Sequence, residues 1–137
     1  MGYMDLKQKL IEGDYSICAS NGYTSYDKGI KPVILPMNED LYFFKDLIVA
    51  DKLIGKASAM LLTLSGVKEV HTFTLSKAGK EIFDKYGITY SYDKLVDYII
   101  NREGTGMCPM EMTVRDIDDL KEAFAALNRK LEELRKK

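Results

Sequence analysis

Histidine and cysteine are scarce in this sequence: its 137 residues include one histidine, His71, and two cysteines, Cys18 and Cys108. A single histidine severely restricts metal chemistry, because protein zinc sites are built mainly from His and Cys ligands. Two cysteines make no disulfide framework, and both are expected to be free thiols in a reducing cytoplasm. We therefore expect a cytoplasmic protein with no bound metal and no other cofactor.

The sequence also lacks an excess of positive or negative residues, and it lacks a long apolar segment. The 20 basic and 21 acidic residues nearly cancel, and only the last residues are dominated by Lys and Arg. This balance argues against a nucleic-acid partner. The longest apolar runs, such as residues 59–62, are far too short to span a membrane. The N-terminus has no basic segment followed by an apolar one, so neither a secretory signal nor a membrane partner is predicted.

What is present fits a single domain over residues 1–137, long enough to bury a core without disulfides. After a hairpin signal at Asn21-Gly22, strand-type and helix-type spacings alternate. This order predicts an α/β protein with one mixed sheet that helices cover on both faces. The predicted elements are a helix with Leu6 and Leu10 ending near Gly13, strands at 15–20 and 23–26, a loop or irregular extended piece at 28–36, a short helix from Asn38 to Phe44, a helix at 50–66, a strand at 67–75, a helix capped by Ser76 with Gly87 after its end, a strand at 88–92, a short helix at 95–100 leading into a strand-like stretch at 99–102, a helix beginning near Cys108, and a last helix capped by Asp116 or Asp118.

The clearest helical pattern occupies residues 50–66. It places Asp51, Lys52 and Lys56 in the first two turns, where two lysines oppose the helix dipole. A bound anion such as phosphate would relieve this conflict, whereas in the alternative both lysines simply reach solvent. Gly55 costs helix stability and permits a close backbone contact with a strand or a ligand. The apolar positions of the pattern are Ala50, Leu53, Ile54, Ala57, Leu61 and Leu64, with Gly66 at its end.

The most informative segment is 101–111, where a glycine-rich turn precedes a cysteine at the start of a predicted helix. Pro109 suits the first helical position, and Glu111 stands three residues after Cys108, as in a capping box. A thiol there faces unpaired N–H groups and the positive end of a helix dipole, which favours the thiolate. Cys108 is therefore a candidate nucleophile or sulfur carrier. The alternative is a small residue packed beneath a tight turn.

Polar residues around this turn are candidates for ligand binding, together with Lys56. An arginine at a strand end beside a helix N-terminus can clamp a carboxylate or phosphate, although a surface pair with Glu103 explains Arg102 equally well. Glu111 is in the first place a capping carboxylate and in the second a proton-transfer group. The candidates in the segment before Cys108 are Asn101, Arg102, Thr105 and Gly106.

The other two residues with reactive side chains are interpreted as structural. His71 lies within a predicted strand among alternating residues, where a core or edge-strand histidine is expected rather than a catalytic one. Cys18 lies in the first predicted strand and is expected to be a buried, small apolar residue.

Two motifs, following a helix and a hairpin, resemble a known family. They are Asp51-Lys52-x-x-Gly55-Lys56-Ala57 and Asn101-Arg102-x-Gly104-Thr105-Gly106-x-Cys108-Pro109-Met110-Glu111. The resemblance is to the domain-of-unknown-function family numbered 1893, over almost the whole chain, and it implies the cytidine-deaminase-like fold. That fold is a three-layer α/β/α sandwich around a mixed sheet of about five strands. Because deaminase-like folds often self-associate, the resemblance also implies a homodimer.

In zinc deaminases, one site helix opens with a His or Cys ligand and a glutamate, and a later helix supplies two cysteines. By resemblance, Asp51 and Lys52 lie at the first of these positions and Cys108 at the second. The chain departs from the pattern, because no histidine is near Asp51 and Glu111 stands where the second cysteine would be. Ordinary nucleobase deamination is therefore not expected.

Two functions of different class follow from these residues. In the first, Cys108 performs metal-free cysteine chemistry or sulfur transfer, while Lys52 favours its thiolate or donates a proton. In the second, the chain binds a nucleotide or another anionic small molecule without catalysis. Both interpretations expect the thiol and the Lys52 ammonium to share one cleft. The catalytic candidates of the first function are Cys108, Lys52, Asp51 and Glu111.

Overall fold

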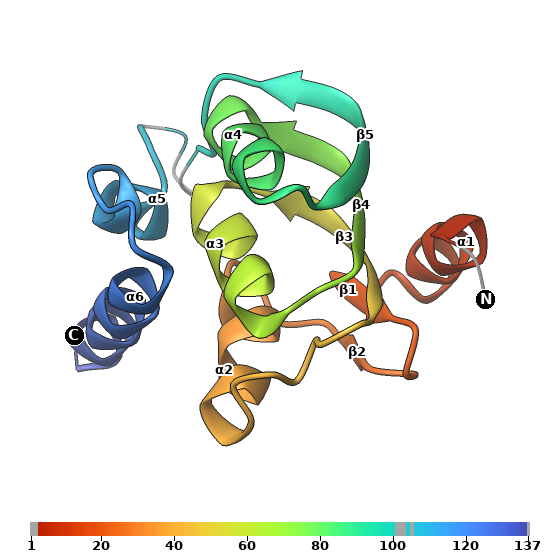
Figure 1. The fold of residues 1–137 in the computed structure, drawn as a ribbon, viewed down its shortest axis with the longest axis horizontal. Helices are drawn as coiled ribbons and strands as arrows, with labels where there is room; N and C mark the ends of the chain where they lie inside the picture. The colour runs from red at the N-terminus through yellow and green to blue at the C-terminus, as the bar shows by residue number, and fades with distance from the viewer. Residues whose placement is uncertain (1–2, 101–103, 105, 137) are drawn as a thin grey trace.

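The computed structural model describes residues 3–100, 104 and 106–136, which form helices on both faces of one sheet (Figure 1). The elements along the chain are α1 (Tyr3–Gly13), β1 (Ile17–Ala19), β2 (Thr24–Ser25), α2 (Lys31–Glu39), β3 (Ile48–Ile54), α3 (Lys56–Ser65), β4 (Glu69–Ser76), α4 (Lys77–Tyr86), β5 (Thr89–Val96), α5 (Pro109–Val114) and α6 (Leu120–Arg135).

The five strands form one mixed sheet in the order β2-β1-β3-β4-β5. β1 is antiparallel to both β2 and β3, whereas β3, β4 and β5 are parallel to one another. The connection from β3 to β4 contains α3, and the connection from β4 to β5 contains α4; both connections move in the same direction across the sheet. Because such connections are right-handed, α3 and α4 lie on the same face of the sheet. The predicted α/β class and the five-stranded mixed sheet are thus confirmed.

The helices form a thin layer on one face and a thick layer on the other. In Figure 1, α1 lies on one side of the sheet, where it packs on β1 and β3. α2, α3 and α4 cover the opposite side, and α5 and α6 pack against the outer surface of α3. The layers are therefore helix, sheet and helices, with two further helices stacked outside.

Two apolar clusters follow from these layers. The smaller cluster lies beneath α1 and joins Leu6 and Leu10 to Cys18 and Ala50, which confirms Cys18 as a buried residue. His71 is also buried, and its Nδ1 is 2.5 Å from Ser91 Oγ on the neighbouring strand, as expected for a core histidine. The main cluster fills the other side of the sheet. Its largest fully buried members are Phe44, Phe83, Ile17, Ile34, Met37, Ile54, Met60, Leu61, Leu62 and Leu75.

Several local signals in the sequence give the structure they predict. Ser76 caps α4, because its hydroxyl accepts a 3.0 Å hydrogen bond from the Gly79 N–H. Gly66 and Gly87 end α3 and α4 in the left-handed conformation, with φ of 89° and 68°. Pro109 occupies the first turn of α5. These signals were readable because each depends on a few neighbouring residues.

The helix predicted at 50–66 is wrong in its first half. Residues 48–54 form β3, and the helix begins only at Lys56, after Gly55 as N-cap. β3 lies between β1 and β4 and is buried on both faces over residues 49–51. A strand buried on both faces reads as a continuous apolar run, which periodicity alone does not separate from a buried helix. Asp51 and Lys52 therefore lie on a strand.

The loop predicted at 28–36 is also wrong, because Lys31–Glu39 form α2 with Pro36 inside the helix. Proline removes the hydrogen bond that would run to the carbonyl four residues earlier. Here that carbonyl, of Pro32, accepts a 2.7 Å hydrogen bond from the Tyr23 hydroxyl instead. Asn38 lies within α2 rather than capping a following helix, and its amide pairs with Asn128 of α6 at 2.9 Å.

Two predictions in the C-terminal part need correction. The short helix predicted at 95–100 is absent, since β5 continues to Val96 and Ile100 forms an isolated antiparallel bridge with Met107. The last helix is capped by Asp119 rather than by Asp116 or Asp118, because the Asp119 carboxylate accepts the Glu122 N–H at 2.8 Å. Three closely spaced aspartates offer the same signal, and the cap falls on the one that directly precedes the helix.

Candidate functional site

The Glu111 carboxylate lies on the N-terminus of α3. One oxygen accepts the Lys56 N–H at 2.7 Å, and the other accepts the Ala57 N–H at 2.9 Å. The first N–H groups of a helix have no partner within it, so a carboxylate placed there satisfies two donors and meets the positive end of the dipole. Glu111 thus joins α5 to α3, two helices that are far apart in the sequence.

This arrangement corrects the predicted capping box. Glu111 does not reach back to the Cys108 N–H, which donates a 2.8 Å hydrogen bond to the carbonyl of Ile99. The spacing of the two residues fits the motif, but the donors on α3 lie within reach and leave the carboxylate buried, with 8% of the residue exposed. Burial raises the pKa of Glu111, while the two N–H groups and the nearby Lys56 act in the opposite direction.

Two glycines allow this close approach. A Cβ on Gly55 would lie 2.3 Å from Glu111 Oε1 and 2.7 Å from Ile99 Cγ1, so any side chain at this position would displace the carboxylate. A Cβ on Gly79 in α4 would lie 3.1 Å from the Gly55 carbonyl oxygen. The close backbone contact expected of Gly55 is therefore present. It brings the β3–α3 turn, α4 and α5 together at the carboxyl ends of the parallel strands.

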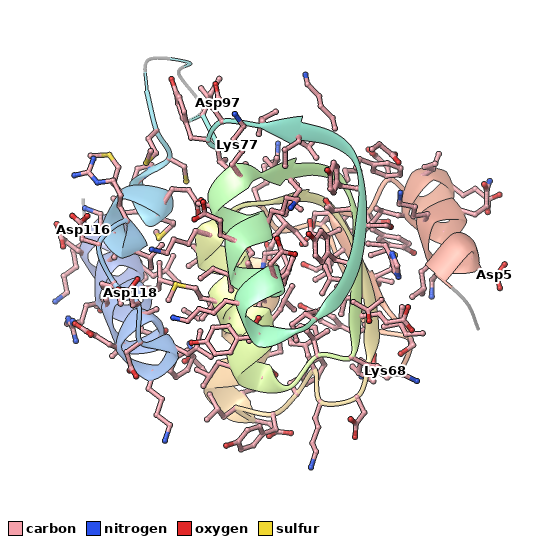
Figure 2. The ribbon with its side chains drawn as sticks, turned by 45° about the horizontal axis from the view of Figure 1, so that its top comes forward. Asp5, Lys68, Lys77, Asp97, Asp116 and Asp118 are labelled. Atoms are coloured by element: carbon pink, nitrogen blue, oxygen red, sulfur yellow. The ribbon has the colours of Figure 1, made fainter. Side chains whose placement is uncertain are left out.

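A cavity of about 270 Å³ opens beside this junction. In open α/β sheets, such crevices at the carboxyl ends of the strands are the usual place for ligands. Figure 2 shows Lys77 and Asp97 at this end of the sheet and Lys68 at the opposite end. The cavity is lined by Lys56 from α3, Ser76 from β4, Ala78, Glu81, Ile82 and Lys85 from α4, Asp97 and Tyr98 after β5, Met107, Glu111 and Arg115 from the α5 region, and Asp118.

The charges of the cavity are mixed, and two of its acidic groups already have partners. Asp97 pairs with Lys77 at 2.7 Å, and Glu111 is held by backbone N–H groups. The other charged side chains of the lining are three basic and two acidic, and one of them, Arg115, has its Nε atom 3.8 Å from Asp116 Oδ2. The basic ones are Lys56, Lys85 and Arg115, and the acidic ones are Glu81 and Asp118. Lys56 Nζ is fixed toward α5 by a 3.0 Å hydrogen bond to the Arg115 carbonyl.

The structure does not bring the Lys52 ammonium to this cavity. Lys52 Nζ is 2.5 Å from Asp14 Oδ1, just after the end of α1, the helix that covers the other face of the sheet. Asp51 is buried within the sheet, where its Oδ1 accepts the Leu53 N–H at 3.1 Å. Burial raises the pKa of Asp51 to about 7, although hydrogen bonds from the Leu53 and Lys52 backbone act in the opposite direction. Neither residue lines the cavity.

Cys108 is the N-cap of α5 and is half-buried against the main cluster. Its neighbour Met107 lines the cavity, but Cys108 itself does not. The thiol packs on the side of the sheet opposite α1, whereas Lys52 pairs beside α1, so the expected shared cleft is not formed. That Cys108 acts as a nucleophile or sulfur carrier stays a prediction.

The residues that the sequence predicts to bind a ligand fall into two groups, those outside the described part of the structure and those within it. Asn101, Arg102 and Thr105 lie outside the described residues. Gly106 is described and half-buried, a Cβ added to it would meet no atom of the described residues within 4 Å, and it does not line the cavity. Of the predicted ligand-binding residues that the structure describes, Lys56 therefore lines the cavity.

Sequence reasoning missed most of the cavity. Glu81 and Lys85 lie one turn apart on α4 and resemble the exposed charges of any surface helix. Tyr98 lies in a segment whose structure was misread, and Arg115 follows a helix of six residues. The signals that the sequence does carry are Ser76 as a cap and Gly55 as a close contact, whereas Glu111 caps α3 and not the helix on which its spacing predicts it to act. Among the described residues, no three His, Cys, Asp or Glu side chains gather closely enough to hold a metal ion.

Comparison with known proteins matches this chain to one family model, described as Domain of unknown function (DUF1893), over residues 5–131. A solved structure is similar throughout: a DUF1893 family protein from Thermotoga maritima, with 28% sequence identity and a TM-score of 0.85. The match covers 93% of this chain and 88% of that one. None of the curated proteins matches. Of the helices in the described part of the chain, none has the length and apolar character needed to cross a membrane.

Proposed function

Since the chain belongs to the DUF1893 family, whose description leaves the activity open, we propose that it is a binding module for an anionic small molecule, of which nucleotides are one class. The observation that carries the proposal is the cavity at the carboxyl ends of the parallel strands. It combines three basic side chains, Lys56, Lys85 and Arg115, with a rigid floor made by Glu111 and the α3 N-terminus.

The position of these groups supports binding rather than a purely structural role. Lys85 lies on α4, and Arg115 directly follows α5; both side chains are exposed, and both border the same hollow. Lys56 and Arg115 are linked through the 3.0 Å hydrogen bond between Nζ and the carbonyl, which holds α3 and α5 at a fixed spacing. A ligand anion between these cations gains charge-assisted hydrogen bonds without a large rearrangement.

The acidic side chains in the same lining add selectivity to this proposal. Glu81 and Asp118 accept hydrogen bonds from donor groups, such as the amino and hydroxyl groups of a nucleoside, and repel ligands that are anionic throughout. Tyr98 supplies an exposed ring and a hydroxyl at the rim. A nucleoside monophosphate, with one anionic end and one end rich in donors, therefore fits the lining better than a bare polyanion.

Thermal unfolding of the protein with inorganic phosphate and with nucleoside monophosphates tests the proposal. A ligand that binds only the folded state at 100 times its Kd stabilises it by about 2.7 kcal/mol, which raises Tm by several degrees. Lys85→Gln and Arg115→Gln are expected to abolish the increase. Lys68→Gln is the matched control, because Lys68 is exposed at the opposite end of the sheet. The proposal fails when no member of the panel raises Tm, or when the control variant loses the effect equally.

We also propose that the fold is of the cytidine-deaminase-like type. In support, two helices that begin within the predicted site motifs, α3 and α5, converge by their N-terminal ends, as the two ligand-bearing helices of zinc deaminases do. The residues that open the first of these helices are Lys56 and Ala57, rather than Asp51 and Lys52. Glu111 from the second helix contacts both of their N–H groups. Superposition on a zinc deaminase tests this: the metal should fall within about 4 Å of the Glu111 carboxylate, roughly two coordination-shell lengths.

A further inference from the structure

Among the residues that the structure describes, one long edge strand of the sheet, β5, is paired on one side only. β5 ends the strand order and has eight residues, whereas β2 at the other edge has two. β4 pairs with one side of β5 along its whole length. The backbone N–H and C=O groups on the other side of β5 therefore face outward, and Figure 1 shows β5 at the margin of the fold. Proteins usually shorten, bend or block such edges, and β5 contains no proline.

Exposed aromatic and aliphatic residues lie on β5 and in the chain segments directly before and after it. Tyr86 ends α4, Tyr92 lies in β5, and Tyr98 and Ile100 follow β5; these side chains are from 37% to 58% exposed. A shallow hollow of about 440 Å³ lies at the carboxyl end of β5, against Leu95, Val96 and the residues just after them. Tyrosine is enriched in protein–protein interfaces, because it combines a large apolar area with a hydrogen-bonding group.

The two faces of β5 carry different side chains. Tyr90 and Tyr92 lie on the α4 side, where Tyr90 contacts Phe83 and the two tyrosine rings stack with centroids 6.3 Å apart. Ser91 and Asp93 lie on the α1 side, where Ser91 contacts His71, and Asp93 pairs with Lys7 of α1 at 3.2 Å. Any strand added to this edge has to match both rows of side chains.

We propose that a second copy of this chain pairs antiparallel with β5, with Tyr92 opposite the partner's Tyr92 on a two-fold axis normal to the sheet. In this register, Tyr90 lies opposite the partner's Lys94, and Ser91 lies opposite the partner's Asp93. The aliphatic part of a lysine packs on a tyrosine ring and its ammonium is attracted by the ring face, and a serine hydroxyl donates to a carboxylate. The two residues of each opposed pair are an even number of positions apart in the sequence, and side chains alternate along a strand. Their side chains therefore lie on the same face of the sheet.

Charge selects this register among those that give a long ladder. Pairing about Tyr92 or about Asp93 uses seven residues of β5, so these two are the longest symmetric ladders. Pairing about Asp93 would set two carboxylates directly opposite each other, which is unfavourable in a strand pair. Pairing about Lys94 would do the same with two ammonium groups. Pairing about Tyr92 places no like charges opposite each other.

The product is a closed dimer rather than a fibre. Because β5 meets its own copy, both partners use the same surface, and the described part of the chain offers no further long edge. The other edge, β2, offers two residues and is too short to propagate the pairing. Tyr86 before β5 and Tyr98 and Ile100 after it are exposed and therefore available for contacts beyond the strands.

Site-directed disulfide trapping tests both the partner and the register. Directly opposed residues in an antiparallel pair have Cα atoms about 4.5–5.5 Å apart, which a disulfide spans. In a Cys108→Ser background, Tyr92→Cys is therefore expected to give a covalent dimer on mild oxidation. Lys94→Cys is the matched control: it is equally exposed on β5, but its two thiols would be roughly 13 Å apart, four strand residues at about 3.3 Å each.

Charged substitutions of Tyr92 give an independent test, in which dimerisation of the reduced protein is measured. Sedimentation over a range of concentrations is expected to show a dimer for the unchanged chain. Tyr92→Lys and Tyr92→Glu each place like charges on the axis, so each is expected to weaken dimerisation about tenfold or more, whereas an equimolar mixture of the two restores it. A monomer at every concentration, or trapping at position 94 as fast as at position 92, would overturn the proposal.

Discussion

Glu111 occupies the space that a side chain at residue 55 would need. The Glu111 Oε1 atom lies 2.3 Å from the position of a Cβ on Gly55, although the backbone of Gly55 has an ordinary negative φ of −109°. The glycine is therefore required by space and not by its backbone conformation. This single contact fixes α5 on the N-terminus of α3 and shapes the floor of the cavity.

Gly55→Ala is predicted to destabilise the protein by about 2–3 kcal/mol. The added methyl group displaces the carboxylate and so loses both backbone hydrogen bonds, in addition to the cost of overpacking. Chemical denaturation measures the change. Gly106→Ala is the control, because the corresponding methyl group meets no atom within 4 Å, and its effect should stay within about 0.5 kcal/mol. Equal stability of Gly55→Ala and the unchanged chain would show that the Glu111 contact is dispensable.

Substitution of Glu111 tests the same contact between α5 and the N-terminus of α3. Glu111→Ala leaves two N–H groups of α3 without a partner and should cost about 3 kcal/mol, whereas Glu111→Gln keeps one acceptor and should cost about 1–2 kcal/mol. Denaturation midpoints of both variants give this order. Glu39→Gln, at an exposed position, is the control and should be near neutral. The reverse order of the two Glu111 variants would contradict the capping role.

The buried Asp51 predicts an unusual dependence of stability on pH. Its pKa is raised from 3.8 to about 7 by burial, so the folded state retains a proton that the unfolded state has released between about pH 4 and pH 7. Stability contributed by this group therefore falls as pH rises through that window, by up to about 1.4 kcal/mol per pH unit.

Asp51→Asn removes this titration and keeps an acceptor for the Leu53 N–H. The variant is expected to be more stable than the unchanged chain at pH 7 and similar to it near pH 4. Denaturation at a series of pH values, with the exposed Asp116→Asn as reference, measures the difference. A constant difference between pH 4 and pH 7 would mean that Asp51 does not titrate in this window.

Local signals in the sequence predicted the parts of the fold that depend on few residues. Ser76 as a helix cap, Gly66 and Gly87 as helix ends, and the hairpin between β1 and β2 all follow from local backbone chemistry. β3 was misread, because its burial between two strands is a property of the whole sheet and its apolar residues also fit a helix. α2 was missed because Tyr23, which satisfies the carbonyl opposite Pro36, comes from a different element.

The sequence predicts several residues of the candidate site, but it does not predict how these residues are arranged in space. Glu111 and Gly55 were both singled out, but their contact joins positions 56 apart and no spacing rule predicts it. Lys52 was placed on a helix face with Lys56, and the strand turns it instead toward Asp14 near α1. The side chains of Glu81 and Lys85 gain significance only from the cavity that the tertiary fold creates beside them.

The thiol hypothesis predicts rapid alkylation of Cys108 at neutral pH, because an activated thiol reacts as the thiolate. Iodoacetamide labelling followed by peptide mass spectrometry measures the rate at each cysteine. Cys18 is fully buried and supplies an internal control that should label slowly. A rate for Cys108 no greater than that of free glutathione would remove the case for cysteine chemistry.

The proposed function places an anionic small molecule in the cavity between α3, α4 and α5. Titration of isotopically labelled protein with adenosine monophosphate, followed by amide NMR spectra, tests this most directly. Saturable shifts are expected at the amides of Lys56, Ala78 and Tyr98, which border the cavity, and none at Lys68. Spectra that stay unchanged at millimolar nucleotide, or shifts confined to Lys52 and its surroundings, would contradict it.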